Sequence, residues 1–208
     1  MYDFVIKNAA VIDGTGRDGY RADLAFAGGR IAEIGKIDSK DGLDASGLVA
    51  CPGFIDMHTH MDLELLRDKS PDAKIRQGVT LDLLGQDGLG TAPVSKENQP
   101  LLRDILSGLN GILPEEQWTW GTFSEYLNAL ERRKLPNNVA VLLSHGPVRI
   151  EVMGMSERKA TRRELSAMKR IVAEAMSAGA YGFSSGLIYP PCPYADADEL
   201  IELNREVA

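Results

Sequence analysis

The sequence predicts an α/β protein in which a short β-rich segment precedes a parallel array of strands and helices. Residues 1–50 contain short β-prone runs and no helical period. After Pro52, four apolar runs end in polar residues, which is typical of parallel strands that are buried on both faces. Segments with the periodicity of amphipathic helices separate these runs. Alternation of this kind favours a parallel sheet covered by helices.

The amino-terminal segment is expected to form short strands joined by glycine turns. The β-prone runs lie at residues 4–6, 10–12, 24–27, 31–35 and 48–50. Gly28 and Gly29 stand between the third and fourth runs, and this spacing predicts a β-hairpin. No residue of this segment suggests chemistry.

The rest of the chain is expected to alternate between strands and helices. Strands are expected at residues 53–58, 79–85, 139–145 and 180–185, and helices at 71–77, 99–107, 122–134, 161–178 and 196–208. Thr161 and Glu164 have the spacing of a capping box, and Gly179 is expected to end that helix. Asp196, followed by Glu199, is expected to cap the last helix.

Composition excludes several classes of protein. Lys plus Arg number 23 against 30 for Asp plus Glu, so the net charge of −7 disfavours binding to nucleic acid. No apolar run approaches the roughly 18 residues of a membrane span, and no signal peptide is visible at the amino terminus. Cys51 and Cys192 make no disulfide framework, which favours a reducing compartment such as the cytoplasm.

His58 and His60 form the motif that most directly suggests chemistry. They stand at the end of the first apolar run, and side chains at positions i and i+2 of a strand point the same way. Two neutral imidazoles on one side suit zinc, iron or nickel ions. A histidine more often has a structural role, but two of the three histidines in the chain share this motif. We therefore expect a metal site here.

Four motifs occur in an order that is typical of one enzyme family. They are Gly53–His60, Gln77–Thr80, Ser144–Gly146 with the following Arg149, and Gly182–Pro191. In this order they resemble the amidohydrolase superfamily, and most closely the N-acyl-D-amino-acid deacylases (D-aminoacylases). The resemblance extends from Asp3 to the end of the chain.

This resemblance implies a fold and an activity. Residues 52–208 would be the amino-terminal half of a TIM-type (β/α)8 barrel, and residues 1–51 a β-sandwich segment whose partner strands are missing. The implied activity is metal-dependent hydrolysis of the amide bond of a small-molecule N-acyl-D-amino acid, releasing a carboxylate and a D-amino acid. His58 and His60 would bind zinc. The general base would be an Asp on the eighth strand, beyond residue 208, so these 208 residues are expected to be inactive alone and either to self-associate or to lack a carboxy-terminal half.

Asp87 marks a departure from the pattern of the family. In the deacylases that the chain resembles, a cysteine after the second strand binds the metal, whereas this chain has Asp87 within Gly85–Gly88. A carboxylate is a harder ligand than a thiolate and shifts the preference away from soft metals. Asp87 is expected to bind the metal or to orient a histidine that does. The alternative is a turn residue, because Asp-Gly is a common turn dipeptide.

Three further residues are candidates for contact with the substrate. Tyr189 resembles a family residue that lies near the substrate. The guanidinium of Arg149 matches a substrate carboxylate in shape, although a surface ion pair is the role that we favour. His145 is expected to end the third strand, where it would be a ligand, a substrate contact or a structural residue. The resemblance does not make it a principal zinc ligand, so we favour a structural role or one that orients a ligand. Asp62 and Glu64 are expected close to the histidines, and neither is assigned a catalytic role.

The sequence leaves three other functions open. Gly182–Gly186 fits the nucleophile elbow G-x-S-x-G with Ser184 as nucleophile, but prolines rather than a helix follow, and no histidine comes later. A cyclic-amide hydrolase of the dihydroorotase or hydantoinase type would need a carboxylated lysine at a strand end, whereas Lys134 and Lys169 lie in or beside expected helices. A non-catalytic fragment or binding module is the third alternative.

Overall fold

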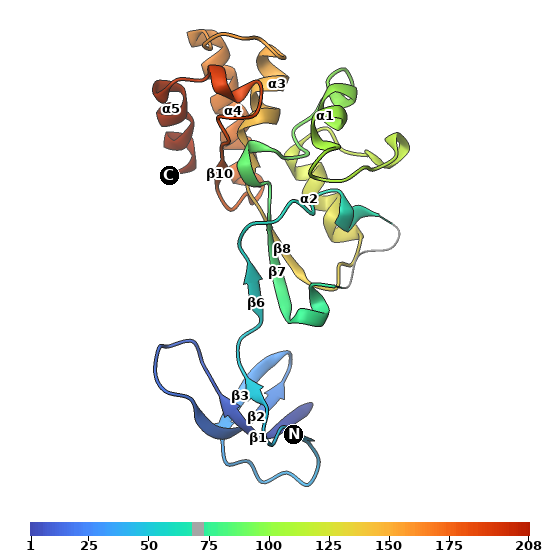
Figure 1. Ribbon diagram of the computed structural model, residues 1–208, viewed down its shortest axis with the longest axis vertical. Helices are drawn as coiled ribbons and strands as arrows, with labels where there is room; N and C mark the ends of the chain where they lie inside the picture. Colours follow the sequence, from blue (N-terminus) through green and yellow to red (C-terminus); the bar gives the residue numbers. More distant parts are fainter. Residues whose placement is uncertain (68–72) are drawn as a thin grey trace. The chain divides into compact units, whose positions relative to one another are not determined.

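A computed structural model describes residues 1–67 and 73–208 of the chain. The chain divides into two compact units, Met1–Gly53 and Phe54–Ala208. All helices of the described residues belong to the second unit (Figure 1).

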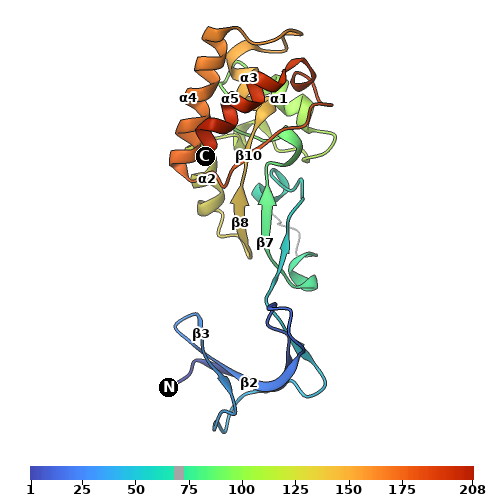
Figure 2. The same cartoon turned by 90° about the vertical axis from the view of Figure 1, so that its left-hand side faces the viewer.

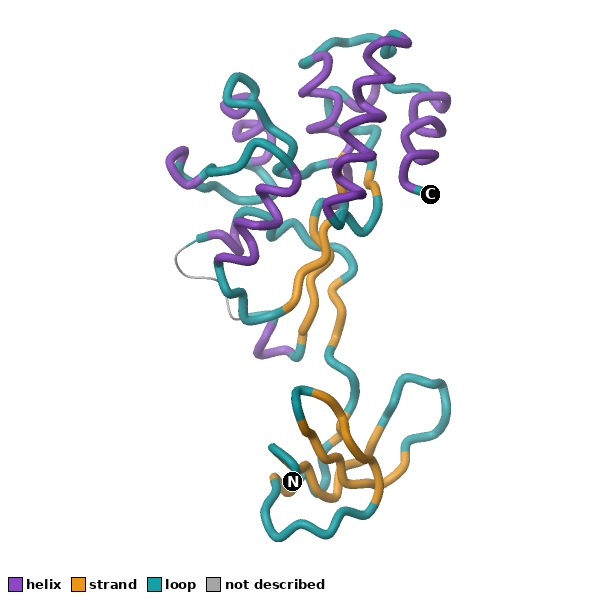
Figure 3. Tube along the Cα trace, turned by 180° about the vertical axis from the view of Figure 1, so that it is seen from behind, coloured by secondary structure: helices purple, strands orange, loops and turns teal. Residues whose placement is uncertain are grey.

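The first unit is a five-stranded sheet with the order β3-β2-β1-β4, in which β5 also pairs with β1. Its strands are β1 (Phe4–Val11), β2 (Tyr20–Ala27), β3 (Arg30–Gly35), β4 (Leu43–Asp44) and β5 (Val49–Ala50). The predicted hairpin is confirmed, because β2 and β3 pair antiparallel across Gly28 and Gly29, both at positive φ. Figure 3 shows that this unit consists of strands and loops alone.

The runs at residues 4–6 and 10–12 were expected as separate strands, and this expectation is wrong. They form the single strand β1, whose register against β2 shifts between Ile6 and Ala9. Asn8 lies at this irregularity with φ 61°. The polar residues between the runs therefore mark a bulge within one strand, which sequence periodicity does not distinguish from a break between two.

The described part of the second unit contains two small sheets, both parallel as the apolar runs predicted. One has the order β6-β7-β8 and the other pairs β9 with β10. The strands are β6 (Phe54–Asp56), β7 (Val79–Leu84), β8 (Asn138–Val141), β9 (Leu143–Ser144) and β10 (Phe183–Ser184). Leu142 alone separates β8 from β9, and Figure 2 shows β7 and β8 side by side. The third apolar run therefore contacts β7 through its first part and β10 through its second.

The described residues of this unit form five α-helices, and four of them were predicted. They are α1 (Gln99–Leu106), α2 (Phe123–Arg132), α3 (His145–Met153), α4 (Arg162–Ala178) and α5 (Ala197–Val207). Short 3-10 turns span Glu64–Leu66, Ile75–Gln77, Gln86–Gly88, Glu115–Gln117 and Cys192–Tyr194. The predicted capping box of Thr161 and Glu164 and the left-handed Gly179 delimit α4. The helix expected at 71–77 begins outside the described residues, and its described part contains only the turn at Ile75–Gln77.

Helix α3 was not predicted, and residues 139–145 were expected to form a strand that ends at His145. The strand ends one residue earlier, at Ser144, and His145 begins α3. Residues 145–150 are all buried, so this helix has no polar face and no amphipathic period. A helix that is buried on all sides leaves no pattern that sequence analysis can detect.

A large apolar cluster forms the core of the second unit. Trp118 and Trp120 stack within it with ring centroids 4.9 Å apart, so both rings contribute to the packing of the core. The indole N–H of Trp120 donates to the carbonyl of Thr91 at 2.8 Å, so its polar atom is satisfied inside the core. Among the described residues, none of the helices combines the length and apolar character that crossing a membrane requires.

Candidate metal centre

His58 and His60 lie in the segment that directly follows β6. The backbone N–H of His58 donates to the carboxylate of Asp56 at 3.2 Å. Lys74 donates from Nζ to the hydroxyl of Thr59 at 2.7 Å and pairs with Asp56 at 2.7 Å. One ammonium group therefore restrains the residues on both sides of His58. The imidazole rings lie edge to face with centroids 5.4 Å apart.

Asp87 lies in the tight turn that follows β7. Its backbone has φ 56° and ψ 23°, the left-handed region that is uncommon for residues other than glycine and less so for Asp. The amide of its neighbour Gln86 donates to the carbonyls of Met57 at 2.8 Å and Leu83 at 3.1 Å. This side chain ties the end of β7 to the segment that carries the two histidines.

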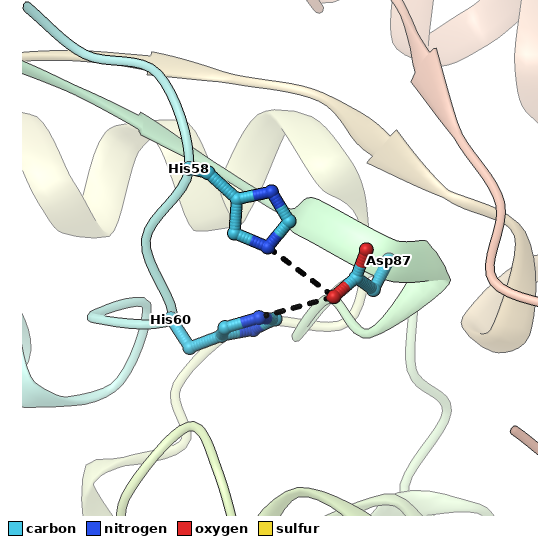
Figure 4. Close-up of side chains that lie close together, drawn as sticks. All are labelled: His58, His60 and Asp87. Atoms are coloured by element: carbon cyan, nitrogen blue, oxygen red, sulfur yellow. Dashed lines mark ion pairs between the residues drawn. The ribbon is translucent and has the colours of Figure 1, made fainter.

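The three side chains converge on one point, as Figure 4 shows. The Oδ2 atom of Asp87 lies 3.3 Å from Nε2 of His58 and 3.4 Å from Nε2 of His60. A charge-assisted hydrogen bond would be shorter, about 2.8 Å. Two ligand atoms bound about 2.1 Å from a tetrahedral ion lie about 3.4 Å apart. The separation of the donors therefore fits a small divalent ion, and two imidazoles with a carboxylate are a suitable donor set for zinc and related metals.

The surroundings of His60 favour the form of imidazole that binds a metal. Burial lowers the pKa of His60, the Asp87 carboxylate opposes this effect, and the neighbouring His58 adds to it. The net lowering keeps the ring neutral near neutral pH, and only a neutral imidazole has a nitrogen lone pair to give to an ion. His58 is more open, with 58% of its side chain exposed against 14% for His60. The imidazole of His60 is thus mostly buried and that of His58 lies at the surface.

Asp62, which was given no catalytic role, is a buried support of this centre. Its carboxylate accepts hydrogen bonds from the N–H of Gly85 at 2.9 Å and from the amide of Asn110 at 3.1 Å. Complete burial raises the pKa of Asp62 to about 7, against the opposing effect of these hydrogen bonds. Asp62 stands two residues after His60, and Gly85 two residues before Asp87. The sequence shows that Asp62 is close to His60 along the chain. It does not show that Asp62 binds Gly85, because that contact joins segments that are far apart in the sequence.

His145 and Arg149 lie in a different cluster, around Glu199 of α5. Nε2 of His145 lies 2.8 Å from a Glu199 carboxylate oxygen, and Nη1 of Arg149 lies 2.6 Å from both oxygens. His145 and Arg149 have no exposed surface, and Glu199 has 3%. The ion pair suggested for Arg149 therefore exists, but it is buried and not on the surface. Contact of either residue with substrate stays a prediction, and the structure does not bring them together with His58, His60 and Asp87.

The loop after β10 contains Tyr189, and its backbone contacts the turn of Asp87. Tyr189 is half-buried, and its backbone N–H donates to the carbonyl of Gly186 at 3.1 Å. A Cβ atom at Gly186 would lie 2.1 Å from the carbonyl oxygen of Asp87, so these two backbones touch. No α-helix follows Ser184 before α5, so the chain lacks the helix that a nucleophile elbow requires. The substrate contact of Tyr189 stays a prediction.

Comparisons with known proteins extend over the whole chain. The model of the amidohydrolase family matches residues 41–204. A D-aminoacylase from Alcaligenes xylosoxydans is 38% identical over 100% of this chain and 42% of its own length. An N-acyl-D-aspartate deacylase from the same organism is 39% identical over 97% of this chain and 40% of its own length.

A solved structure agrees with these relatives. The N-acyl-D-glutamate deacylase from Bordetella bronchiseptica, complexed with zinc and a phosphonate inhibitor that mimics the tetrahedral intermediate, superposes with a TM-score of 0.86. It is 35% identical, and the match covers 99% of this chain and 42% of that one. The chain thus spans about two fifths of the length of the relatives that it matches.

Proposed function

The chain belongs to the amidohydrolase family, and we propose that it carries the first metal ligands of an enzyme that hydrolyses N-acyl-D-amino acids. The observation that carries this proposal is that the ligand atoms of His58, His60 and Asp87 all lie within 4.8 Å of one another, close enough to bind one ion. The relatives that support the substrate class are a D-aminoacylase and deacylases of N-acyl-D-aspartate and N-acyl-D-glutamate.

We propose that the second unit is the first half of a TIM-type barrel. Strands β6, β7, the β8–β9 pair and β10 adjoin in chain order and are parallel, which supports this fold. His58, Asp87 and Tyr189 all follow the carboxyl end of a strand, where such barrels place their active sites. The first unit would be the β-sandwich segment, completed by strands from elsewhere in the protein.

His58, His60 and Asp87 would hold one divalent ion, with zinc as the first candidate. When bound, such an ion supplies a Lewis acid that polarises a carbonyl and activates water near neutral pH. The residues of this chain provide the conditions for binding. His60 presents a neutral imidazole from a partly buried position, and Asp87 presents a carboxylate. The hydrogen bonds of Lys74 to Thr59 and of Gln86 to Met57 fix the segment that carries the histidines.

The substrate is proposed to be a small N-acyl-D-amino acid, with Tyr189 close to it. The general base would lie on a later strand, so turnover belongs to the whole protein and not to residues 1–208. The net charge of −7 agrees with a small-molecule partner better than with nucleic acid. The two free cysteines support a reducing compartment such as the cytoplasm.

Metal analysis of the purified chain tests the site. We expect about one equivalent of zinc or cobalt in the wild type and loss of binding in the double variant His58→Ala, His60→Ala. A matched control is His145→Ala, which removes the third histidine from a cluster elsewhere. Equal metal content in the wild type and the double variant would overturn the proposed ligands.

Activity assays on the whole protein test the substrate class. A panel of N-acetyl-D- and N-acetyl-L-amino acids is expected to show release of the free amino acid from D substrates only. Dihydroorotate and hydantoin belong in the same panel. Turnover of these cyclic amides without turnover of N-acetyl-D-amino acids would contradict the proposed reaction.

A further inference from the structure

The serine motif Gly182–Gly186, which the proposed reaction leaves without a role, contacts the turn that carries Asp87. Ser184 stands at the end of β10, and its hydroxyl reaches two backbone groups of that turn. It accepts a hydrogen bond from the N–H of Gly88 at 3.0 Å and donates to the carbonyl of Gly85. The carbonyl of the first residue and the N–H of the fourth are the groups that bond directly in an ordinary four-residue turn. Here one hydroxyl bridges them.

Asp87 is the residue of this turn whose backbone conformation is unfavourable, since glycine adopts positive φ without steric cost. Gly85, Asp87 and Gly88 have φ of 75°, 56° and 70°, and a residue other than glycine in this region costs of order 1 kcal/mol or more. Two other side chains fasten only Gly85: Asp62 accepts from its N–H, and Ser144 donates to its carbonyl at 2.9 Å. Among the described contacts, Ser184 is the side chain that holds both ends of the turn.

The backbones of the two segments also fit closely. A Cβ atom at Gly88 would lie 2.9 Å from the backbone nitrogen of Gly186, and one at Gly186 would lie 2.1 Å from the carbonyl oxygen of Asp87. A shift of the loop after β10 is therefore transmitted to the backbone of Asp87. The carboxylate of Asp87 stands 3.3 and 3.4 Å from the two imidazoles, and an ion tolerates little change in those distances.

We propose that Ser184 is a positioning residue that sets the metal affinity of the His58–His60–Asp87 site through its hydroxyl. The proposal rests on the proposed function, because it presumes that these three residues bind the ion. Ser184 then acts on Asp87 through the turn and does not itself contact the ion or attack a substrate. Removal of groups that orient metal ligands typically weakens metal binding by about 10- to 100-fold.

The test is a Co²⁺ titration of the purified chain followed by visible absorption, with zinc affinity measured by competition against a chelator. We expect Ser184→Ala to weaken binding by about 10- to 100-fold. Ser184→Thr keeps a hydroxyl and is expected to stay close to the wild type. Ser185→Ala is the matched control, because its hydroxyl lies 3.0 Å from Nδ1 of His145 and not at the turn. Urea unfolding of the metal-free proteins separates lost affinity from lost stability.

The outcomes separate this inference from the proposed function. If the wild type binds no cobalt, or if the double variant His58→Ala, His60→Ala binds it equally well, the proposed function fails. If the wild type binds cobalt and Ser184→Ala binds it as tightly, or if Ser185→Ala weakens binding to the same extent, the role of Ser184 alone is overturned. Should Ser184→Ala not fold, Ser184→Cys retains the volume with a weak hydrogen-bonding group, and unchanged affinity in that variant would overturn the role.

Discussion

The ammonium nitrogen of Lys74 lies 2.7 Å from a carboxylate oxygen of Asp82, a residue of β7 with 1% of its surface exposed. The same nitrogen contacts Asp56 and the hydroxyl of Thr59, so it joins two strands to the segment of His58 and His60. Burial lowers the pKa of Lys74, but the hydrogen bonds to Asp56 and Asp82 outweigh this and raise it. Lys74 is therefore charged at neutral pH, as the buried carboxylate requires.

Replacing Lys74 by Met should destabilise the chain. Among the described residues, the amide of Asn137 would remain as a side-chain partner of Asp82, and a buried carboxylate without its cation is costly. We expect the free energy of unfolding in urea to fall by about 2–4 kcal/mol. Lys159→Met, at an exposed pair with Asp196, is the control and should change little. Equal stability of Lys74→Met and the wild type would contradict this role.

Replacing Asp87 by Cys should change the character of the metal site. A thiolate is a softer ligand than a carboxylate, so the variant should gain affinity for soft ions such as Cd²⁺ relative to Mn²⁺. Its Co²⁺ form should gain a sulfur-to-cobalt charge-transfer band in the near ultraviolet. Asp87→Ala removes the ligand and should weaken binding of both ions by at least about tenfold. A Cys variant that binds cobalt without the new band would show that position 87 does not contact the ion.

Replacing Glu199 by Gln should destabilise the cluster of α3 and α5. Arg149 has no exposed surface, and its guanidinium also donates a hydrogen bond to the backbone carbonyl of Arg158. Loss of the carboxylate would leave a buried cation unpaired, at a cost of about 3–5 kcal/mol in the free energy of unfolding. Glu202→Gln, at a partly exposed pair with Lys169, is the matched control on the same helix and should change less. An equal fall in the free energy of unfolding in both variants would contradict the prediction that burial makes the Glu199 pair the more important of the two.

The contribution of Glu199 should also depend on pH. Burial opposes its ionisation, but hydrogen bonds from His145 and Arg149 outweigh burial and lower its pKa below the usual 4.5. A lowered pKa in the folded state means that the stabilisation is present above about pH 4.5 and is lost as the pH falls through the folded value. The difference in unfolding free energy between wild type and Glu199→Gln should therefore shrink below about pH 4.5. A difference that grows on acidification would refute this assignment.

The two cysteines should differ sharply in reactivity. Cys51 is exposed, whereas Cys192 is buried, and burial raises the pKa of Cys192 to about 12. Because the thiolate is the reactive form, Cys192 should resist iodoacetamide at pH 8 while Cys51 is labelled. Peptide mass spectrometry should find a single modified cysteine in the folded chain and two in urea. Labelling of Cys192 in the folded chain would show that the segment around it opens.

Much of the fold follows from local patterns. The hairpin at Gly28 and Gly29, the parallel apolar strands and the capped helix α4 depend on neighbours within a few residues, and all three are confirmed. Helix α3 was missed because a helix with buried residues on every side has no period to read. The bulge at Asn8 was missed because an unpaired residue inside a strand resembles a turn between two strands.

The sequence by itself determined the family resemblance, the succession of strands and helices, and the pair His58 and His60 as the first place to look for a metal. Their spacing is local, so two imidazoles adjoin in any extended segment. Only the tertiary structure decided that Asp87 faces both rings and that His145 and Arg149 surround Glu199 instead. It also decided that Ser184 bridges the turn of Asp87 across 96 residues of chain. These contacts join segments that are far apart in the sequence, and the packing of strands and helices, not any local pattern, brings their atoms within bonding distance.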